Sequence, residues 1–135
     1  MPDQIYKVSW NGEEKLNFVY DPLGRLTSKT ILVGGGDPDT PKLSTKYTYY
    51  DTGDNHTTTL VQSLQTPVGT YNYTYDAVGN ITGTTFGEDS VTYEYDALNQ
   101  LTRENNSERG WTITYEYQNG NITEMRMYEY TAGSL

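Results

Sequence analysis

The chain has 135 residues with 14 tyrosines and no cysteine, and its 18 acidic side chains outnumber 9 basic ones. The net charge of -9, without a cluster of Lys and Arg, excludes the positive stripe that a phosphate backbone requires, so we expect no nucleic-acid partner. The lack of cysteine excludes disulfides, and no apolar run approaches the roughly 20 residues that span a bilayer, so we expect no membrane insertion.

Alternation of apolar and polar residues predicts an all-β chain of eleven strands without a helix. Asn11-Gly12 and Asn119-Gly120 favour tight reversals between strands. The predicted strands, in chain order, are residues 5–10, 16–20, 26–33, 43–50, 57–64, 70–75, 81–86, 91–95, 101–105, 112–117 and 122–130.

A short unit recurs along these strands, and it is clearest as Tyr73-Thr74-Tyr75-Asp76-Ala77-Val78-Gly79-Asn80-Ile81-Thr82. Internal repeats of this kind decide the architecture of a chain before any single element does. The copies, in chain order, are residues 18–27, a degenerate one at 47–55, then 73–82, 93–102, a looser one at 115–123, and a truncated start at 128–130.

Each part of the unit has a physical role. Tyr-x-Tyr places two rings on one face of a strand, the following Asp accepts N–H groups from the turn, and Gly or Asn accepts a positive φ. Leu or Ile and then Thr begin the return strand, so one copy corresponds to about one antiparallel β-hairpin. The residues assigned this structural role are Tyr20, Asp21, Gly24, Tyr50, Asp51, Tyr73, Tyr75, Asp76, Gly79, Asn80, Tyr93, Tyr95, Asp96, Asn99, Tyr115, Tyr117, Gly120 and Asn121.

The pattern Tyr-x-Tyr-Asp-x-x-Gly-Asn-Leu/Ile-Thr resembles the YD repeat of the RHS (rearrangement hot spot) family. This family includes bacterial polymorphic toxins, wall-associated proteins, C components of insecticidal toxin complexes, and animal teneurins. Its long arrays wind as a spiral β-sheet into a hollow shell, which encloses a payload in the toxins and forms a barrel at the cell surface in teneurins. The resemblance therefore implies that this chain is a segment of such a wall.

On this basis we expect a single YD-repeat domain over residues 1–135, with about five to six hairpins in an antiparallel meander that forms a curved or spiral sheet, a partial shell. The expected function is a non-catalytic scaffold for encapsulation or surface display of a toxin or adhesion module. The expected partners are neighbouring repeats of a larger secreted or cell-surface bacterial protein, or further copies that associate through sheet edges.

No catalytic, cofactor-binding or metal-binding residue is assigned. The only histidine, His56, lies in a polar turn, where a solvated side chain is the simpler interpretation. Asp21-Pro22-Leu23-Gly24 partly matches the Asp-Pro-x-Gly motif of the self-cleaving core of toxin shells, but it lies in the first copy and is interpreted as a turn. Residues 37–39 and 51–55 carry oxygen ligands suited to Ca²⁺ without the regular spacing of a known loop.

The alternative function is carbohydrate binding, because sugar rings stack on exposed aromatic faces and a sheet can present several rings in a row. Trp10 and Trp111 are the first candidates for such stacking. Core packing remains the competing interpretation for most of the aromatic residues. Encapsulation requires a buried tyrosine face, whereas carbohydrate binding requires part of that face to be exposed.

Overall fold

The computed structural model describes residues 4–33, 42–51 and 57–133. The chain divides into two compact units, Met1–Thr70 and Tyr71–Leu135, and the division falls within one strand, Gly69–Tyr75. Each unit is described by itself below. The expectation of a single domain over residues 1–135 stays a prediction.

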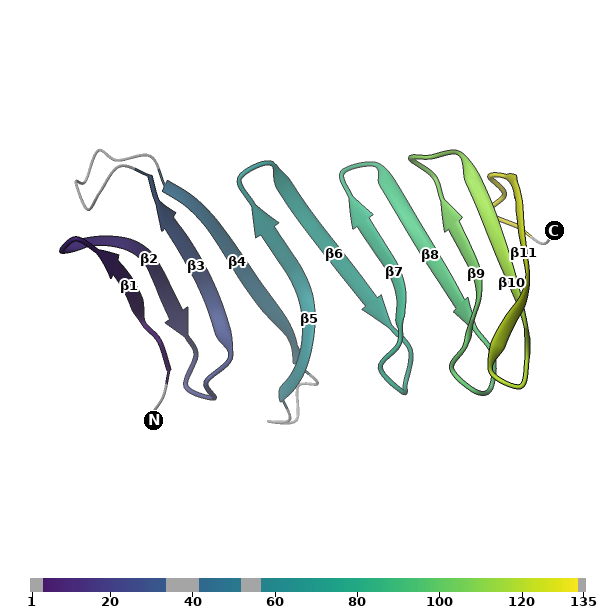
Figure 1. Ribbon diagram of the computed structural model, residues 1–135, viewed down its shortest axis with the longest axis horizontal. Coiled ribbons are helices and arrows are strands. Elements are labelled where there is room, and N and C mark those ends of the chain that lie inside the picture. The colour runs from purple at the N-terminus through teal and green to yellow at the C-terminus, as the bar shows by residue number, and fades with distance from the viewer. Residues whose placement is uncertain (1–3, 34–41, 52–56, 134–135) are drawn as a thin grey trace. The chain divides into compact units, whose positions relative to one another are not determined.

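The first unit is an antiparallel meander in which each strand pairs with the next one along the chain (Figure 1). The tight turn at Asn11-Gly12, with φ of 51° and 79°, lets Trp10 pair directly with Glu13. Pairing therefore begins earlier than the predicted start at residue 16. The strands are β1 (Lys7–Trp10), β2 (Glu13–Tyr20), β3 (Leu26–Leu32), β4 (Lys42–Asp51) and β5 (Thr57–Thr66).

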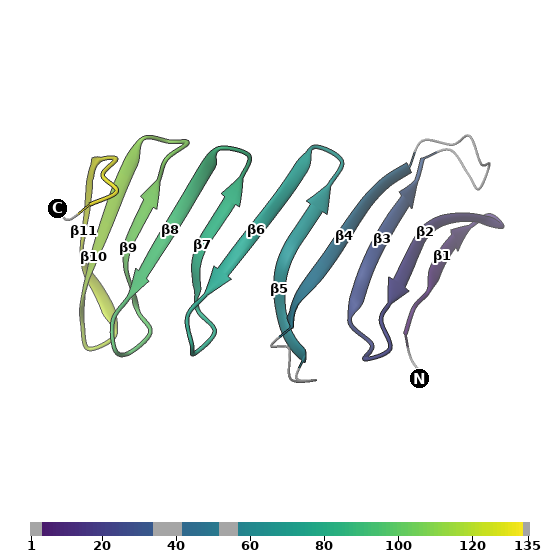
Figure 2. The same ribbon diagram turned by 180° about the vertical axis from the view of Figure 1, so that it is seen from behind.

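The second unit repeats this arrangement, and the reverse view shows the same order of neighbours (Figure 2). Its strands are β6 (Gly69–Tyr75), β7 (Ile81–Phe86), β8 (Asp89–Tyr95), β9 (Leu101–Asn106), β10 (Trp111–Gln118) and β11 (Asn121–Glu129). β11 is the last strand in the order, and among the described residues it pairs with β10 alone.

These pairings confirm the all-β class and the antiparallel meander of hairpins. All regular structure in the described residues is β-strand, and each predicted strand has its counterpart, with ends that differ by a few residues. The curved or spiral course expected for this sheet, as a partial shell, stays a prediction.

Alternation divides the second unit into two faces. In β6, Tyr71, Tyr73 and Tyr75 are half-buried, while the intervening Asn72 and Thr74 are exposed. The cross-strand register carries the same division through β7 to β11, because directly paired residues share a face. The side with these rings is called the tyrosine face. The other side, with Thr74, is called the threonine face.

Deep burial is scarce. Ile113 is the one buried hydrophobic side chain among the described residues, at 7% exposure. The other buried side chains, Asn105, Asn106 and Thr112, are polar and lie in the same unit. Tyr6, Tyr128 and Tyr130 are exposed, and the remaining tyrosines are half-buried. Stability therefore depends mainly on contacts and hydrogen bonds between neighbouring strands, as expected for a repeat protein.

Candidate functional site

The recurring feature of the molecule is the turn that follows each Tyr-Asp pair. In the turn after β6, Asp76 Oδ1 accepts the N–H groups of Val78 at 3.0 Å and Asn80 at 2.9 Å. Its Oδ2 accepts Asn80 Nδ2 at 2.8 Å. Two backbone bonds, from Gly79 N to Asp76 O and from Asp76 N to Asn80 O, complete the reversal. A single carboxylate thus satisfies three donors that the turn would otherwise leave to solvent.

The same geometry recurs after β8. Asp96 Oδ1 accepts the N–H groups of Leu98 at 2.8 Å and Gln100 at 2.9 Å, and Oδ2 accepts Gln100 Nε2 at 2.9 Å. Gly79 and Asn99, one residue before the side-chain donors, have φ of 97° and 60°. Gly or Asn at this position accordingly adopts the left-handed conformation that the turn requires.

It recurs again after β2. Asp21 Oδ1 accepts the N–H groups of Leu23 and Arg25, both at 2.9 Å, and Oδ2 accepts Arg25 Nε at 2.6 Å. Gly24 has a φ of 81°. The residue four positions after Asp is Arg in this turn and Asn or Gln in the others, and each donates to the same carboxylate oxygen. This donor was missed in the sequence, although a side chain with an N–H group at that spacing was the available signal.

The environment of these carboxylates favours the ionised form. Partial burial raises the pKa of Asp76, but the hydrogen bonds from Asn80, Val78 and Gly79 outweigh it, so the pKa lies below its usual value. The pKa of Asp96 is lowered chiefly by the Gln100 N–H group, against the opposing effect of burial.

The copy at 115–123 uses different turn chemistry. Gln118 stands where the other copies have Asp, and it pairs directly with Asn121 across the tight turn at Asn119-Gly120. Asn119 and Gly120 have φ of 53° and 78°, as a two-residue hairpin turn requires. This turn closes without a carboxylate.

The second tyrosine of a copy links neighbouring strands through its hydroxyl. Tyr95 on β8 donates to the backbone oxygen of Ile81, the first residue of β7, at 2.8 Å. Tyr117 on β10 donates to the oxygen of Leu101, the first residue of β9, at 2.9 Å. Tyr20 on β2 donates to the oxygen of Ile5 at 3.0 Å. The bonds of Tyr95 and Tyr117 tie the end of one strand to the first residue of the preceding strand, and the bond of Tyr20 reaches Ile5, two residues before β1.

In the degenerate copy this link belongs to Tyr49, whose hydroxyl donates to Leu26 O at 2.7 Å. Asp51 pairs with Thr57 inside the strand ladder, and the Tyr50 oxygen accepts the Thr58 hydroxyl at 3.0 Å. The register of this copy is therefore offset relative to the others. The remainder of its turn, residues 52–56, lies outside the described residues.

A threonine occupies a β-bulge in the copies at 18–27, 73–82, 93–102 and 115–123. The register shifts between Glu94 and Tyr95, so Thr102 has no partner across the ladder. Its hydroxyl instead donates to Glu94 O at 3.1 Å. Thr27 and Thr123 bond the carbonyl oxygens of Val19 and Glu116 in the same way, at 3.1 and 3.2 Å. In these three copies a hydroxyl bonds the carbonyl that the bulge leaves without its usual donor, whereas Thr82 in the clearest copy donates to the Thr74 hydroxyl at 3.0 Å.

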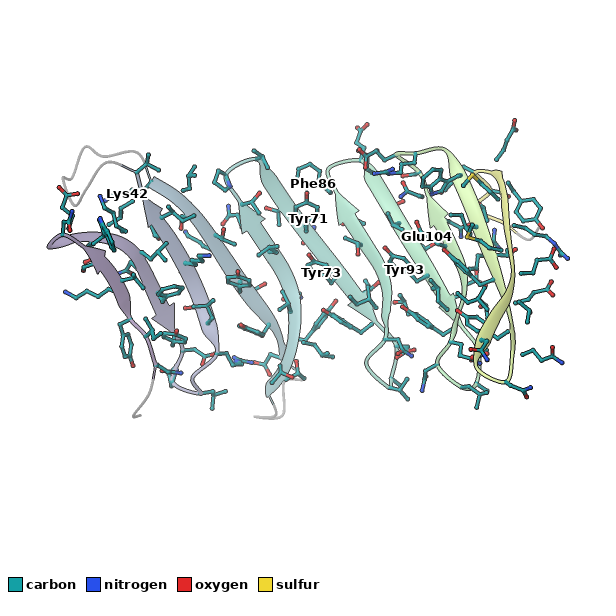
Figure 3. All side chains as sticks on the ribbon, viewed as in Figure 1. Lys42, Tyr71, Tyr73, Phe86, Tyr93 and Glu104 are labelled. Carbon is teal, nitrogen blue, oxygen red and sulfur yellow. The ribbon has the colours of Figure 1, made fainter. Side chains whose placement is uncertain are left out.

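The tyrosine face also carries a carboxylate. The register places Tyr93, Glu104 and Ile113 in one row across β8, β9 and β10, and Figure 3 labels Tyr93 and Glu104 on neighbouring strands. Partial burial, and then the charge of Glu104, raise the pKa of the Tyr93 and Tyr115 hydroxyls. Both hydroxyls therefore stay protonated throughout the physiological range.

The two tryptophans have different surroundings. Trp10, at the end of β1, is 70% exposed. Trp111 is half-buried, its Nε1 is buried without an acceptor, and the Arg109 guanidinium lies 5.3 Å from the ring centroid. Trp10 is therefore the more exposed of the two rings.

Several sequence candidates lie outside the described residues, namely His56, residues 37–39 and most of the segment 51–55. Within the described ranges, no group of three His, Cys, Asp or Glu side chains is placed to hold a metal ion. The same ranges contain no helix of the length and apolarity needed to cross a membrane.

The comparisons with known proteins point to the repeat itself. Residues 75–109 match the family model described as RHS Repeat. The match contains both turns closed by Asp76 and Asp96 and the strands β7, β8 and β9. No curated protein matches the chain.

Proposed function

We propose that this chain, an RHS/YD-repeat protein, is a non-catalytic structural segment of the wall of a larger β-sheet assembly. The wall serves either to encapsulate a module or to display one at a surface. The proposal rests on the observation that a tyrosine hydroxyl link, a bulge threonine and a turn aspartate occur together in both the copy at 18–27 and the copy at 93–102.

These groups support structure rather than chemistry. The hydroxyls of Tyr95 and Tyr117 bond backbone oxygens, and the Asp76 and Asp96 carboxylates bond their own turns. These hydrogen bonds hold the tyrosine hydroxyl protons and the carboxylates to the protein's own backbone and side chains, which is the arrangement that a structural role requires. Secretion or cell-surface placement, as part of a larger bacterial protein, is proposed with the wall role because family members with such walls act outside the cytoplasm.

The open edge of β11 is the proposed contact with the next element. β11 pairs with β10 on one side, and its Met125 and Met127 side chains are 60% and 57% exposed. An exposed strand edge beside apolar side chains is a template for another strand. The occupant is either the next repeat of the same protein or a second copy of the chain.

The gene sequence beyond Leu135 tests the wall role. Further Tyr-x-Tyr-Asp units at a spacing near that of Tyr75 and Tyr95 support the proposal, because neighbouring repeats then pair with this segment. An unrelated sequence on both sides of the segment would contradict it.

Sedimentation at micromolar concentrations tests the edge. The chain is expected to self-associate, and Met125→Lys is expected to abolish the association because a lysine on an edge strand opposes pairing. The control is Val68→Lys, which places the same charge on an 81% exposed residue outside the strands and is expected to leave association unchanged. A wild-type chain that remains monomeric, or a Met125→Lys variant that associates equally, contradicts the edge proposal.

Carbohydrate binding is retained as a second candidate because of the exposed indole of Trp10. A glycan array tests it with Trp10→Ala as the variant and Trp111→Ala as the comparison. Binding that is lost only with Trp10→Ala supports a stacking site. Absence of binding, or equal binding by Trp10→Ala and the wild type, contradicts it.

A further inference from the structure

A small cavity of about 80 Å³ lies on the tyrosine face of the second unit, near the shared end of β6, β7 and β8. The rings of Tyr71 and Phe86 form one wall, with centroids 4.5 Å apart and planes 27° apart, and Figure 3 labels both residues. Thr84 and Val91 add to the lining. Asp89, Ser90 and Glu108 complete it, and both acidic residues are exposed. The site thus combines an aromatic wall with negative charge at its mouth.

The two carboxylates have no basic partner. Neither Asp89 nor Glu108 forms an ion pair or a hydrogen bond through its side chain within the described ranges. By contrast, the ion pairs of the second unit gather on the threonine face: Glu94 with Arg103, and Glu116 and Glu124 with Arg126. The register confirms this placement, because Arg103 and Arg126 both pair with Thr114. Arg109 follows Glu108 in the chain, but its guanidinium lies over the Trp111 ring and forms no ion pair with Asp89 or Glu108 within the described residues.

The residues that line the cavity indicate which class of ligand it can bind. An anion would meet two carboxylates, so it is disfavoured. A volume of about 80 Å³ is well below the roughly 300–1,000 Å³ of sites for drug-sized molecules, so the ligand is a small group. A cation gains from the faces of aromatic rings and from the two carboxylates, and a short methylene chain gains from contact with Phe86 and Val91. A primary ammonium on an alkyl stem satisfies all of these requirements.

We propose that this cavity binds an alkylammonium group, with the ammonium between the Asp89 and Glu108 carboxylates and the alkyl stem against the Tyr71–Phe86 ring pair. Two sources share this chemistry, the lysine side chain of another polypeptide and a small free amine. The site is separate from the strand edge of β11 and from the turn aspartates.

Titration of the full chain with n-butylammonium chloride, followed by amide NMR, tests the proposal. Saturable shifts are expected at residues around Tyr71, Phe86, Asp89 and Glu108, and the apparent Kd is expected to increase with salt because exposed charges are screened. 1-Butanol, with the same stem and no charge, is expected to give no saturable shift. Equal responses to butanol and butylammonium, or butylammonium shifts confined to other regions, would overturn the proposal.

Two variants separate the site from general attraction to an acidic chain. The double substitution Asp89→Asn with Glu108→Gln is expected to weaken butylammonium binding by about tenfold or more, or about 1.4 kcal/mol. Glu88→Gln is the matched control, because Glu88 is exposed, adjoins Asp89 and does not line the cavity. Its Kd is expected to equal that of the wild type. A control that weakens binding as much as the double substitution contradicts a specific site.

The source of the amine is distinguished by comparing butylammonium with N-acetyl-lysine N-methylamide, which carries the ammonium on a capped residue. Equal or tighter binding of the lysine derivative supports a protein partner, and binding of butylammonium alone supports a free amine. Failure of both ligands to bind would overturn the site itself, and it would leave the structural role of the repeats unaffected.

Discussion

The two units of the chain are built from the same repeat but differ in how much they bury. In the described part of the first unit, no side chain is buried, whereas Asn105, Asn106, Thr112 and Ile113 are buried in the second unit. Both units have the Tyr hydroxyl link, the bulge threonine and the aspartate turn. The repeat by itself therefore specifies pairing of strands, and burial requires something more.

The additional element in the second unit is the segment after β11. Tyr130 N donates to Gly110 O at 2.9 Å, and Thr131 N donates to Thr112 Oγ1 at 3.1 Å. Arg103 Nη2 donates to the backbone oxygens of Thr131 and Gly133. The segment thereby covers the threonine face of β9 and β10. Thr112, which is 0% exposed, donates to Asn105 Oδ1 at 2.8 Å beneath it.

The largest expected effect comes from the opposite, tyrosine face of β10, where Ile113 is buried. Ile113→Ala is expected to lower the free energy of unfolding of the second unit by about 3 kcal/mol, because truncation of a buried Ile leaves a cavity. Val19→Ala, at a 49% exposed position in the first unit, is expected to cost less than about 1 kcal/mol. Amide hydrogen exchange, followed residue by residue at increasing urea concentration, measures the free energy of unfolding of each unit separately. Equal losses for the two variants would remove the distinction between the units.

The next largest loss of stability is expected from Arg103, which bonds the segment after β11. Arg103→Ala is expected to cost about 2 kcal/mol, because a charged, 12% exposed side chain loses its bonds to Thr131, Gly133 and Asn105. Exchange of the Thr131 amide is expected to accelerate with it. Arg126→Ala, which removes ion pairs from a half-exposed arginine, is the control and is expected to cost less. A Thr131 amide that stays protected in Arg103→Ala would contradict the covering role.

A smaller effect is expected from the hydroxyl links, and it is predicted to be the same in both units. Tyr95→Phe and Tyr49→Phe are each expected to cost about 1 kcal/mol, the usual contribution of one hydrogen bond. Tyr130→Phe, which loses no hydroxyl bond within the described residues, is expected to have no effect. A neutral Tyr49→Phe would show that the offset copy does not depend on its link.

The smallest effect on stability is expected from the protonation of Asp96 as the pH falls. The folded-state pKa of Asp96 is lowered, so its carboxylate contributes stability above about pH 4, the pKa of an unfolded Asp, and this contribution is lost as pH falls through the folded value. Asp96→Asn keeps an acceptor oxygen but does not titrate. Its stability is therefore expected to fall less than that of the wild type between pH 7 and pH 3 in urea denaturation. An identical decrease would exclude Asp96 as a source of the acid sensitivity.

The sequence predicts the local part of this structure well. Two-residue alternation and the turn residues are local signals, and they place the strands from β1 to β11 with small errors at the ends. Asp76 and Gly79 can be assigned to a turn because their roles involve residues within four positions. The same locality explains why Tyr-x-Tyr indicates one face of a strand.

The sequence does not predict contacts between distant positions. The bonds from Arg103 to Thr131 and Gly133 join residues about thirty positions apart, and no periodicity encodes them. The cavity beside Tyr71 and Phe86 is also lined by Glu108, which lies in the turn between β9 and β10. In the offset copy, the motif alone indicated Tyr50 rather than Tyr49, because the bulges of β4 that shift its register are set by pairing with β5.

The central claim is that the turns closed by Asp76 and Asp96 are structural elements. Their backbone hydrogen bonds open as rarely as those of the strands that they connect. Amide hydrogen exchange across Asp76, Val78 and Asn80, and across Asp96, Leu98 and Gln100, tests it most directly, because each of these N–H groups has a named acceptor. Protection factors equal to those in the adjoining strands β7 and β8 are predicted. Exchange at the rate of an exposed loop at these six positions would contradict the account.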